Sequence, residues 1–377
     1  MTFLIYLLIY ISFTDLFAQL PITSTYAQSL GASTGFIGLI VGVYSFSNLF
    51  SNAFSGQLVD NKGPKKAMLV GFLLNAIILF LYAIVTGPMQ LLAVRFLNGI
   101  TAGLITPAAF TYLSLLNKEK KGQSMAFSGA AVGLAAISAP AFSGIMSSAA
   151  GSEVVYMTIG SLMVAGLLIS LSLKPLQQTN GKTEERSSSS ISAYLELFKN
   201  KGLLFGFIGA VSLAASQGIL AYMLPLKVDA LGLESHVTGM LISVFGIVAV
   251  LFFILPTNRV FDRYPNEVIL PIGILIVALS QTINSFTTIQ AVLLGSMMIY
   301  GIGFALIFPS MAGLITEYSS ENIRGKAFGV FYAFFSLGSF LGSTMTGMFS
   351  LTPEQGLISA AVYLFIVAIS ILWFRKV

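Results

Sequence analysis

Residues 1–17, MTFLIYLLIYISFTDLF, are apolar except for a few hydroxyl side chains and a single carboxylate, Asp15. A helix needs about 20 apolar residues to cross a hydrocarbon core about 30 Å thick, and this run continues to about residue 25. It lacks the positively charged start and the small-residue cleavage site of a secretory signal peptide. We therefore predict a retained membrane span with Asp15 inside it.

The remaining sequence has the same character along its whole length. Apolar residues make up 56% of the 377 residues and charged residues 9%, whereas soluble domains carry about a quarter charged residues. No length remains for a separate soluble domain. The predicted fold class is an all-α polytopic membrane protein with twelve transmembrane helices, at residues 2–25, 35–58, 66–86, 89–116, 123–148, 153–173, 202–226, 237–260, 267–286, 288–316, 325–349 and 355–374.

The Lys and Arg residues indicate how the spans are oriented. Of the 19 basic residues, all but Arg95 and Lys227 fall in every second loop or in the terminal segments on the same side. Such loops stay in the cytoplasm, so both termini are predicted to be cytoplasmic, in the cell membrane, with Lys227 at the outer surface. Residues 174–201 are polar and Ser-rich and predict a cytoplasmic connector between an N-terminal bundle, 1–173, and a C-terminal bundle, 202–377.

The two halves repeat each other at an offset of 202 to 203 residues. The matched pairs are Asp60 and Asp262, Gly99 and Gly301, Pro107 and Pro309, and Gly144 and Gly347. Two similar six-helix halves are one plan of secondary transporters, with the solute site near mid-bilayer between the repeats. The repeat therefore predicts two pseudo-symmetric six-helix bundles and favours a transporter over a receptor or an enzyme.

Three segments carry recognisable motifs. The loop after the second predicted span, GQLVDNKGPKK at residues 56–66, joins a tight Gly-Pro turn to a cationic cluster. The fourth span contains Arg95 and Gly99 in LLAVRFLNGITAG, and the fifth contains Pro140 and Gly144 in GLAAISAPAFSG. These segments resemble the G-x-L-x-D-x-x-G-x-K loop, the R-x-x-x-G pattern and the antiporter signature G-x-x-x-G-P-x-x-G-G of the major facilitator superfamily.

The resemblance covers the whole chain and points to the twelve-span drug/proton antiporter branch of that family. It implies alternating access between the two bundles and a gating role for the loop, in which Asp60 contacts the start of span eleven. In the antiporter signature Ala135, Ala139 and Ser143 replace glycines, so small size is kept. The loop residues that match are Gly56, Leu58, Asp60, Gly63 and Lys65, and the second copy, NRVFDRYPN, keeps Asp262 and Arg263.

Asp15 and Arg95 are the charges predicted to lie inside spans. A charge at the centre of a span costs several kcal/mol, so it normally faces a partner or a wet cavity. At 1.5 Å per residue Asp15 lies about 20 Å from the inner surface and Arg95 about 9 Å from the outer one, which is nearly the same depth. We predict that they pair, that proton uptake by Asp15 releases the pair, and that the solute competes with the proton. The alternative is an ion pair that only fixes helix packing.

Polar residues in the predicted spans are candidate solute contacts. Ser12 and Gln19 share a helical face with Asp15, and Asn98 is one turn from Arg95. Simple interhelical hydrogen bonding is the alternative for each of them. The candidates in the C-terminal half are Gln217, Tyr222, Tyr300 and Tyr332.

Other function classes find little support in the sequence. There is no cysteine and one histidine, His236, which leaves no convergent cluster for an enzyme or a metal site, and no Walker segment for ATP. We expect no cofactor and no nucleic-acid partner. The prediction is a proton-coupled efflux transporter of a small organic solute or drug, monomeric in the bilayer. The alternatives are a dedicated exporter of a polar metabolite such as a metallophore or siderophore, an uptake symporter, and a non-transporting membrane receptor.

Overall fold

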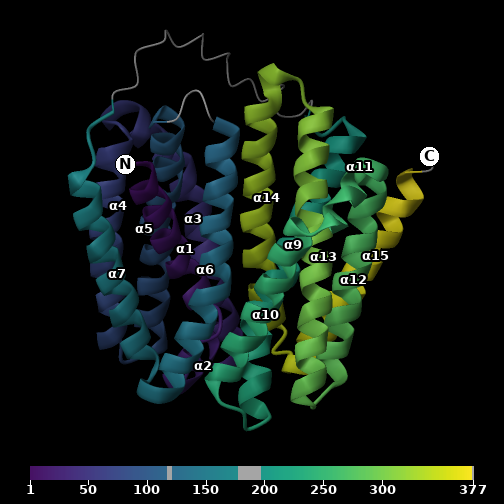
Figure 1. Ribbon diagram of the computed structural model, residues 1–377. Helices are drawn as coiled ribbons and strands as arrows, with labels where there is room; N and C mark the ends of the chain where they lie inside the picture. Colours follow the sequence, from purple (N-terminus) through teal and green to yellow (C-terminus); the bar gives the residue numbers. More distant parts are fainter. Residues whose placement is uncertain (117–120, 177–196, 376–377) are drawn as a thin grey trace. The chain divides into compact units, whose positions relative to one another are not determined.

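The computed structural model describes residues 1–116, 121–176 and 197–375, and all regular structure in these ranges is helical (Figure 1). Eleven helices are long and apolar enough to cross a membrane, and the bent pair α1 and α2 adds a twelfth span. The predicted all-α polytopic fold class is confirmed. The helices of the N-terminal half are α1 (Thr2–Ala18), α2 (Thr23–Ser29), α3 (Thr34–Lys62), α4 (Pro64–Leu81), η1 (Tyr82–Ile84), α5 (Pro88–Leu116), α6 (Lys121–Ala150) and α7 (Ser152–Ser172). Those of the C-terminal half are α9 (Lys201–Ala230), α10 (Ser235–Ile254), η2 (Pro256–Arg259), α11 (Val260–Arg263), α12 (Asn266–Phe286), α13 (Gln290–Tyr318), α14 (Glu321–Met348) and α15 (Pro353–Arg375).

The first span is broken, whereas the sequence predicted one continuous helix over residues 2–25. The helix α1 ends at Ala18, α2 begins at Thr23, and the two are bent by 47°. Pro21 lies in the break, because its ring has no N–H to donate and clashes with the carbonyl group four residues earlier. The backbone N–H of Thr23 donates to the carbonyl oxygen of Gln19 at 3.1 Å, so a helical turn resumes directly after the break.

The chain divides into two compact units, residues 1–181 with 228–243, and residues 182–227 with 244–377. In the first unit α1 packs against α5, α6 and α7, and α4 packs against α5 and α7. In the second unit α12 packs against α13 and α15. The domain boundaries at residues 173 and 202 stay a prediction.

Helix contacts within each unit follow the sequence repeat. In the first unit, Gly99 of α5 lies against the backbone carbonyl group of Tyr44 on α3. In the second unit, Gly301 of α13 lies against the carbonyl group of Phe245 on α10, and a Cβ atom at this position would be 2.7 Å from that oxygen. Because only a glycine admits such close backbone approach, the two halves share the same helix crossing.

Lys227 is buried among helix ends, and its predicted place on the outer side of the membrane stays a prediction. Its side chain is 1% exposed, and its Nζ atom donates to the backbone carbonyl oxygen of Ser285, in the last turn of α12, at 2.7 Å. The carboxylate of Glu354, in the first turn of α15, is 3.7 Å away. Carbonyl groups at a helix C-terminus lack intrahelical partners and attract cations. Lys227 therefore joins the ends of α9, α12 and α15.

The shared glycine crossing predicts matched effects of substitution in the two halves. We expect Gly99→Ala and Gly301→Ala each to lower the free energy of unfolding by about 1–3 kcal/mol, because an added methyl group overpacks the contact with a neighbouring backbone. Gly295→Ala, in α13 with no atom within 4 Å of an added Cβ, is the control and leaves stability unchanged or slightly raised. Thermal unfolding of the purified protein in detergent measures all three, and a control as unstable as the other two would contradict the packing argument.

Candidate functional site

A connected group of polar side chains lies inside the first unit, and we call it the Asp15 network. Its members come from three helices: Asp15 and Gln19 from the end of α1, Asn75 from α4, and Arg95 and Asn98 from α5. Arg95 is 5% exposed, and the other four side chains have no exposed surface. Polar groups are this deeply buried only when they satisfy one another, so the contacts within the network define its chemistry.

The carboxylate of Asp15 accepts hydrogen bonds from three amide groups. Its Oδ1 atom accepts from Nε2 of Gln19 at 2.5 Å. Its Oδ2 atom accepts from Nδ2 of Asn75 at 2.8 Å and from Nδ2 of Asn98 at 3.2 Å. All three partners donate N–H groups, so the site is built to hold the ionised carboxylate.

The amide oxygens of the network are also occupied. Oδ1 of Asn75 accepts from Nδ2 of Asn98 at 2.9 Å and from the hydroxyl group of Thr101 at 2.6 Å. Oδ1 of Asn98 accepts from Nε2 of Gln19 at 3.1 Å and from the hydroxyl group of Tyr82 at 3.2 Å. Asn75 was not among the predicted site residues. The available signal was an amide side chain within the apolar run GFLLNAIILF.

Arg95 lies at the other side of Gln19. Its Nη1 atom donates to Oε1 of Gln19, and its guanidinium carbon is 4.8 Å from the centre of the Tyr44 ring. This aromatic face attracts the cation and replaces part of its lost hydration. The Nε atom of Arg95 is buried and has no hydrogen-bond partner. The guanidinium group therefore keeps unused donor capacity next to the network.

Asp15 and Arg95 lie close together as predicted from their depth, but they do not form the predicted direct pair. The amide of Gln19 lies between them. Its nitrogen donates a hydrogen bond to the carboxylate, and its oxygen accepts one from the guanidinium group. Depth along a helix fixes the height of a side chain but not which neighbour lies between two charges. Gln19 is thus a link between the charges, and its role as a solute contact stays a prediction.

The other predicted cavity residues lie in different surroundings. In the first unit, the hydroxyl group of Ser12 is 3.2 Å from that of Thr106. In the second unit, Tyr222 and Tyr300 have no exposed surface, Gln217 is half-buried, and Tyr332 is 57% exposed. Whether any of them contacts a solute stays a prediction.

Gln281 of α12 is a buried polar residue that the sequence analysis did not select. Its Nε2 atom donates to the hydroxyl group of Ser216 at 2.9 Å, and that hydroxyl group is 3.2 Å from the one of Tyr300. Its Oε1 atom has no hydrogen-bond partner. The second unit therefore has a neutral polar group where the first unit has charges.

The residues of the predicted gating loop are partly described. Gly63 has φ of +83°, a conformation that other residues rarely adopt, and it joins α3 to α4. The Nζ atom of Lys65 donates to the carbonyl oxygens of Leu171, at 2.9 Å, and of Leu173, so it binds the end of α7. Arg263 is exposed at the end of α11. The surroundings of Gly56, Asp60 and Asp262 lie outside what the structure describes, and their gating role stays a prediction.

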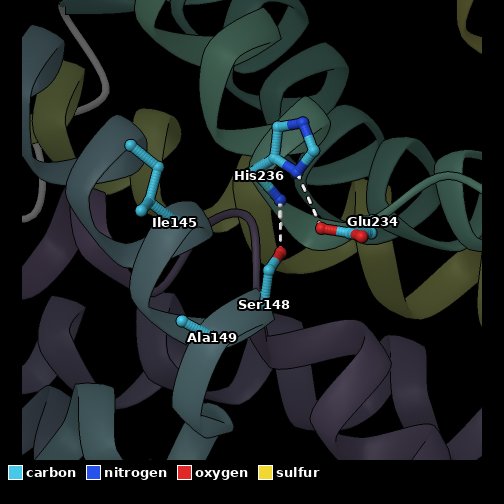
Figure 2. A pocket seen from close by; sticks show the side chains of 5 residues that line it. All are labelled: Ile145, Ser148, Ala149, Glu234 and His236. Carbon is cyan, nitrogen blue, oxygen red and sulfur yellow. Dashed lines mark hydrogen bonds and ion pairs between the residues drawn. The ribbon is translucent and has the colours of Figure 1, made fainter.

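The residues of the predicted antiporter signature lie on α6, where it packs against residues 235–243 of the same unit. Pro140 and Gly144 both approach the backbone of this segment, and a Cβ atom at Gly144 would be 2.8 Å from the carbonyl oxygen of Ser235. Beside this contact is a shallow pocket. At its edge the backbone N–H of His236 donates a hydrogen bond to the hydroxyl group of Ser148 at 2.9 Å (Figure 2). The residues lining it are Ile145, Ser148, Ala149, Glu234 and His236.

Comparison with known proteins identifies the family. The profile of the Major Facilitator Superfamily matches residues 2–234 and again residues 206–377, which together span nearly the whole chain. The chain belongs to the Major Facilitator Superfamily. It is therefore a multi-pass membrane protein of a transporter family, as the resemblance of its motifs predicted.

Two relatives resemble this chain over most of its length at low sequence identity. An uncharacterised MFS-type transporter of Methanocaldococcus jannaschii is 25% identical over 332 residues, covering 87% of this chain and 85% of that protein. The quinolone resistance protein NorA of Staphylococcus aureus is 22% identical over 356 residues, covering 92% of this chain and 88% of NorA. Both relatives match over most of their length.

Solved structures of other transporters have the same fold. The nucleoside transporter NupG superposes with a TM-score of 0.84 at 20% identity, covering 100% of this chain and 99% of NupG. A POT family transporter in complex with 5-aminolevulinic acid gives a TM-score of 0.82 at 13% identity, covering 99% of this chain and 95% of that one. At these identities the likeness concerns the fold of this family member and not its solute.

The hydrogen bonds of Asn75 predict a specific cost of its removal. We expect Asn75→Leu to lower the free energy of unfolding by about 1–3 kcal/mol, because Asp15 loses a donor while the donors of Thr101 and Asn98 lose an acceptor. Asn52→Leu, at an exposed position of α3, is the matched control and should change stability little. Thermal unfolding in detergent compares the two, and equal shifts would show that Asn75 has no special role in the fold.

Proposed function

We propose that this transporter is a proton-coupled exporter of a small organic solute, working by alternating access as a monomer in the cell membrane with both termini cytoplasmic. The observation that carries the proposal is the fully buried carboxylate of Asp15, linked through Gln19 to the buried guanidinium group of Arg95. Ionisable groups inside membrane spans are costly and usually mark proton or solute pathways. The proposed proton carrier is Asp15, and Arg95 senses its charge.

Export is favoured by one relative. NorA is named for quinolone resistance and matches 92% of this chain, and removal of a drug from the cell is a direct way to produce resistance. The predicted antiporter signature on α6 supports the same direction. An amphipathic aromatic solute is therefore our preferred substrate class over a nucleoside, a peptide or a metallophore. An uptake symporter would differ from this proposal in the relative direction of proton and solute movement.

The proposed coupling has a direct test in proteoliposomes. We expect addition of a fluorescent quinolone to evoke proton movement in the opposite direction, reported by a pH-sensitive dye. Asp15→Asn should abolish this coupled flux, because an amide neither takes up nor releases a proton, while leaving quinolone exchange at equal pH on both sides. The matched control is Asp229→Asn, an exposed carboxylate at the end of α9, which should leave coupling intact.

Three results would contradict the proposal. Undiminished coupled flux in Asp15→Asn would remove Asp15 as the proton carrier. Proton and solute moving in the same direction in the native protein would make it a symporter. No proton movement with solute would exclude proton coupling of quinolone transport.

A further inference from the structure

Gln19 occupies a position in which one amide group serves two charges at once. Its nitrogen faces the carboxylate of Asp15 and its oxygen faces the guanidinium group of Arg95. An ionised carboxylate only accepts hydrogen bonds and a guanidinium group only donates them. The amide therefore has a single orientation that satisfies both neighbours while Asp15 is ionised.

The two oxygens of Asp15 differ in their surroundings. Oδ2 accepts from two amide groups, those of Asn75 and Asn98, whereas Oδ1 accepts from Gln19 alone. A proton bound at Oδ2 would displace two hydrogen bonds, and a proton at Oδ1 would displace one. The proton is therefore expected at Oδ1, facing Gln19.

Protonation at Oδ1 reverses the requirement on Gln19. The new O–H group needs an acceptor, which an amide N–H group does not provide, and in the present orientation of Gln19 the oxygens of Asn75 and Asn98 already accept two hydrogen bonds each. The remaining acceptor is Oε1 of Gln19, which reaches the new O–H group when the amide turns over. This rotation turns the amide nitrogen toward Arg95, so two donors face each other and the contact with Arg95 is lost.

The geometry points to Gln19 as a positioning residue that we call the relay between Asp15 and Arg95. When Asp15 takes up a proton, the amide of Gln19 turns over, its contact with Arg95 is lost, and the broken first span is released. This inference rests on the proposed proton coupling and names the group that transmits it. Gln19 also directly follows the last residue of α1, and its backbone carbonyl oxygen accepts from the hydroxyl group of Thr23 at 2.7 Å and from the N–H of Thr23 at 3.1 Å. A change in Gln19 thus acts directly on the α1–α2 break.

Asp15 is the carboxyl group of this network that can take up a proton. Arg95 keeps its charge in proteins, and Asn75 on α4 does not ionise. The other titratable side chains around the network are phenols, which ordinarily stay neutral below about pH 10. They are Tyr44 on α3, Tyr82 in η1, Tyr156 stacked on Tyr82 and Tyr26 on α2, and the nearby Glu153 at the start of α7 is exposed.

Hydrogen–deuterium exchange of residues 16–30 tests this role in the full-length protein in lipid nanodiscs without solute. After correction for the intrinsic pH dependence of amide exchange, we expect native protein to exchange at least about fivefold faster at pH 5 than at pH 9, the lower end of typical coupling between sites. Asp15→Asn should give the fast rate at both pH values. Gln28→Leu, an exposed glutamine at the end of α2, is the matched control and should behave like the native protein.

Two substitutions of Gln19 distinguish a role in transmitting the protonation of Asp15 from a role in packing alone. Gln19→Leu removes both hydrogen bonds, so the exchange rate should no longer depend on pH. Gln19→Met keeps the length of the side chain but has no amide donor or acceptor, so the exchange rate should likewise lose its dependence on pH. A packing role would instead change the rate equally at pH 5 and pH 9 and keep its pH dependence.

The outcomes separate this inference from the proposed function. Native-like pH dependence in both Gln19 variants, or none in the native protein, would overturn the relay. A native protein that shows the pH-dependent exchange but no quinolone-evoked proton flux would overturn the proposed function and leave the relay supported.

Discussion

A carboxylate shielded from water and lipid must obtain its hydrogen bonds from the protein, and this requirement organises the first unit. Asp15 takes one donor from α1, one from α4 and one from α5. These three helices must therefore keep their register for the charge to remain in the interior. The same contacts that stabilise the ionised form make the unit sensitive to the arrival of a proton, because the donor that faces the protonated oxygen then meets a group that itself needs an acceptor.

The two units share a packing plan but differ in their charges. At the offset of 202 residues, Asp15 corresponds to Gln217 and Arg95 corresponds to Met297. The glycine crossings at Gly99 and Gly301 are equivalent, yet within the described residues the one span bent at a break is the first of the N-terminal half. The duplicated scaffold thus holds a charged network and a helix break together in one half. This asymmetry places the buried carboxylate and guanidinium group of the proposed coupling in the first unit.

Much of the fold was predictable from the sequence because a membrane allows few solutions. Apolar runs of sufficient length gave the spans, and the repeat gave the two similar halves. The proximity of Asp15 and Arg95 followed from helical rise alone. The break at Pro21 was missed because the apolar run continues through it, and the residues that follow have no charge to signal a boundary.

The details of the site depend on side-chain packing, which sequence spacing does not determine. Gln19 could be placed on the correct helical face, but not between two charges contributed by different helices. Asn75 is one amide in an apolar run, and its partners come from positions 60 and 23 residues away along the chain. The burial of Lys227 could not be predicted either, because it depends on the carbonyl group of Ser285, 58 residues away along the chain, as its hydrogen-bond acceptor.

The central claim is that Asp15 takes up and releases a proton inside the first unit. Infrared difference spectroscopy of the native protein in bilayers, between acid and alkaline pH, observes this directly through the carbonyl stretch of a protonated carboxyl group. The account predicts such a band at acid pH, its disappearance at alkaline pH, and its absence from the spectra of Asp15→Asn. Identical difference spectra for the two proteins would contradict it.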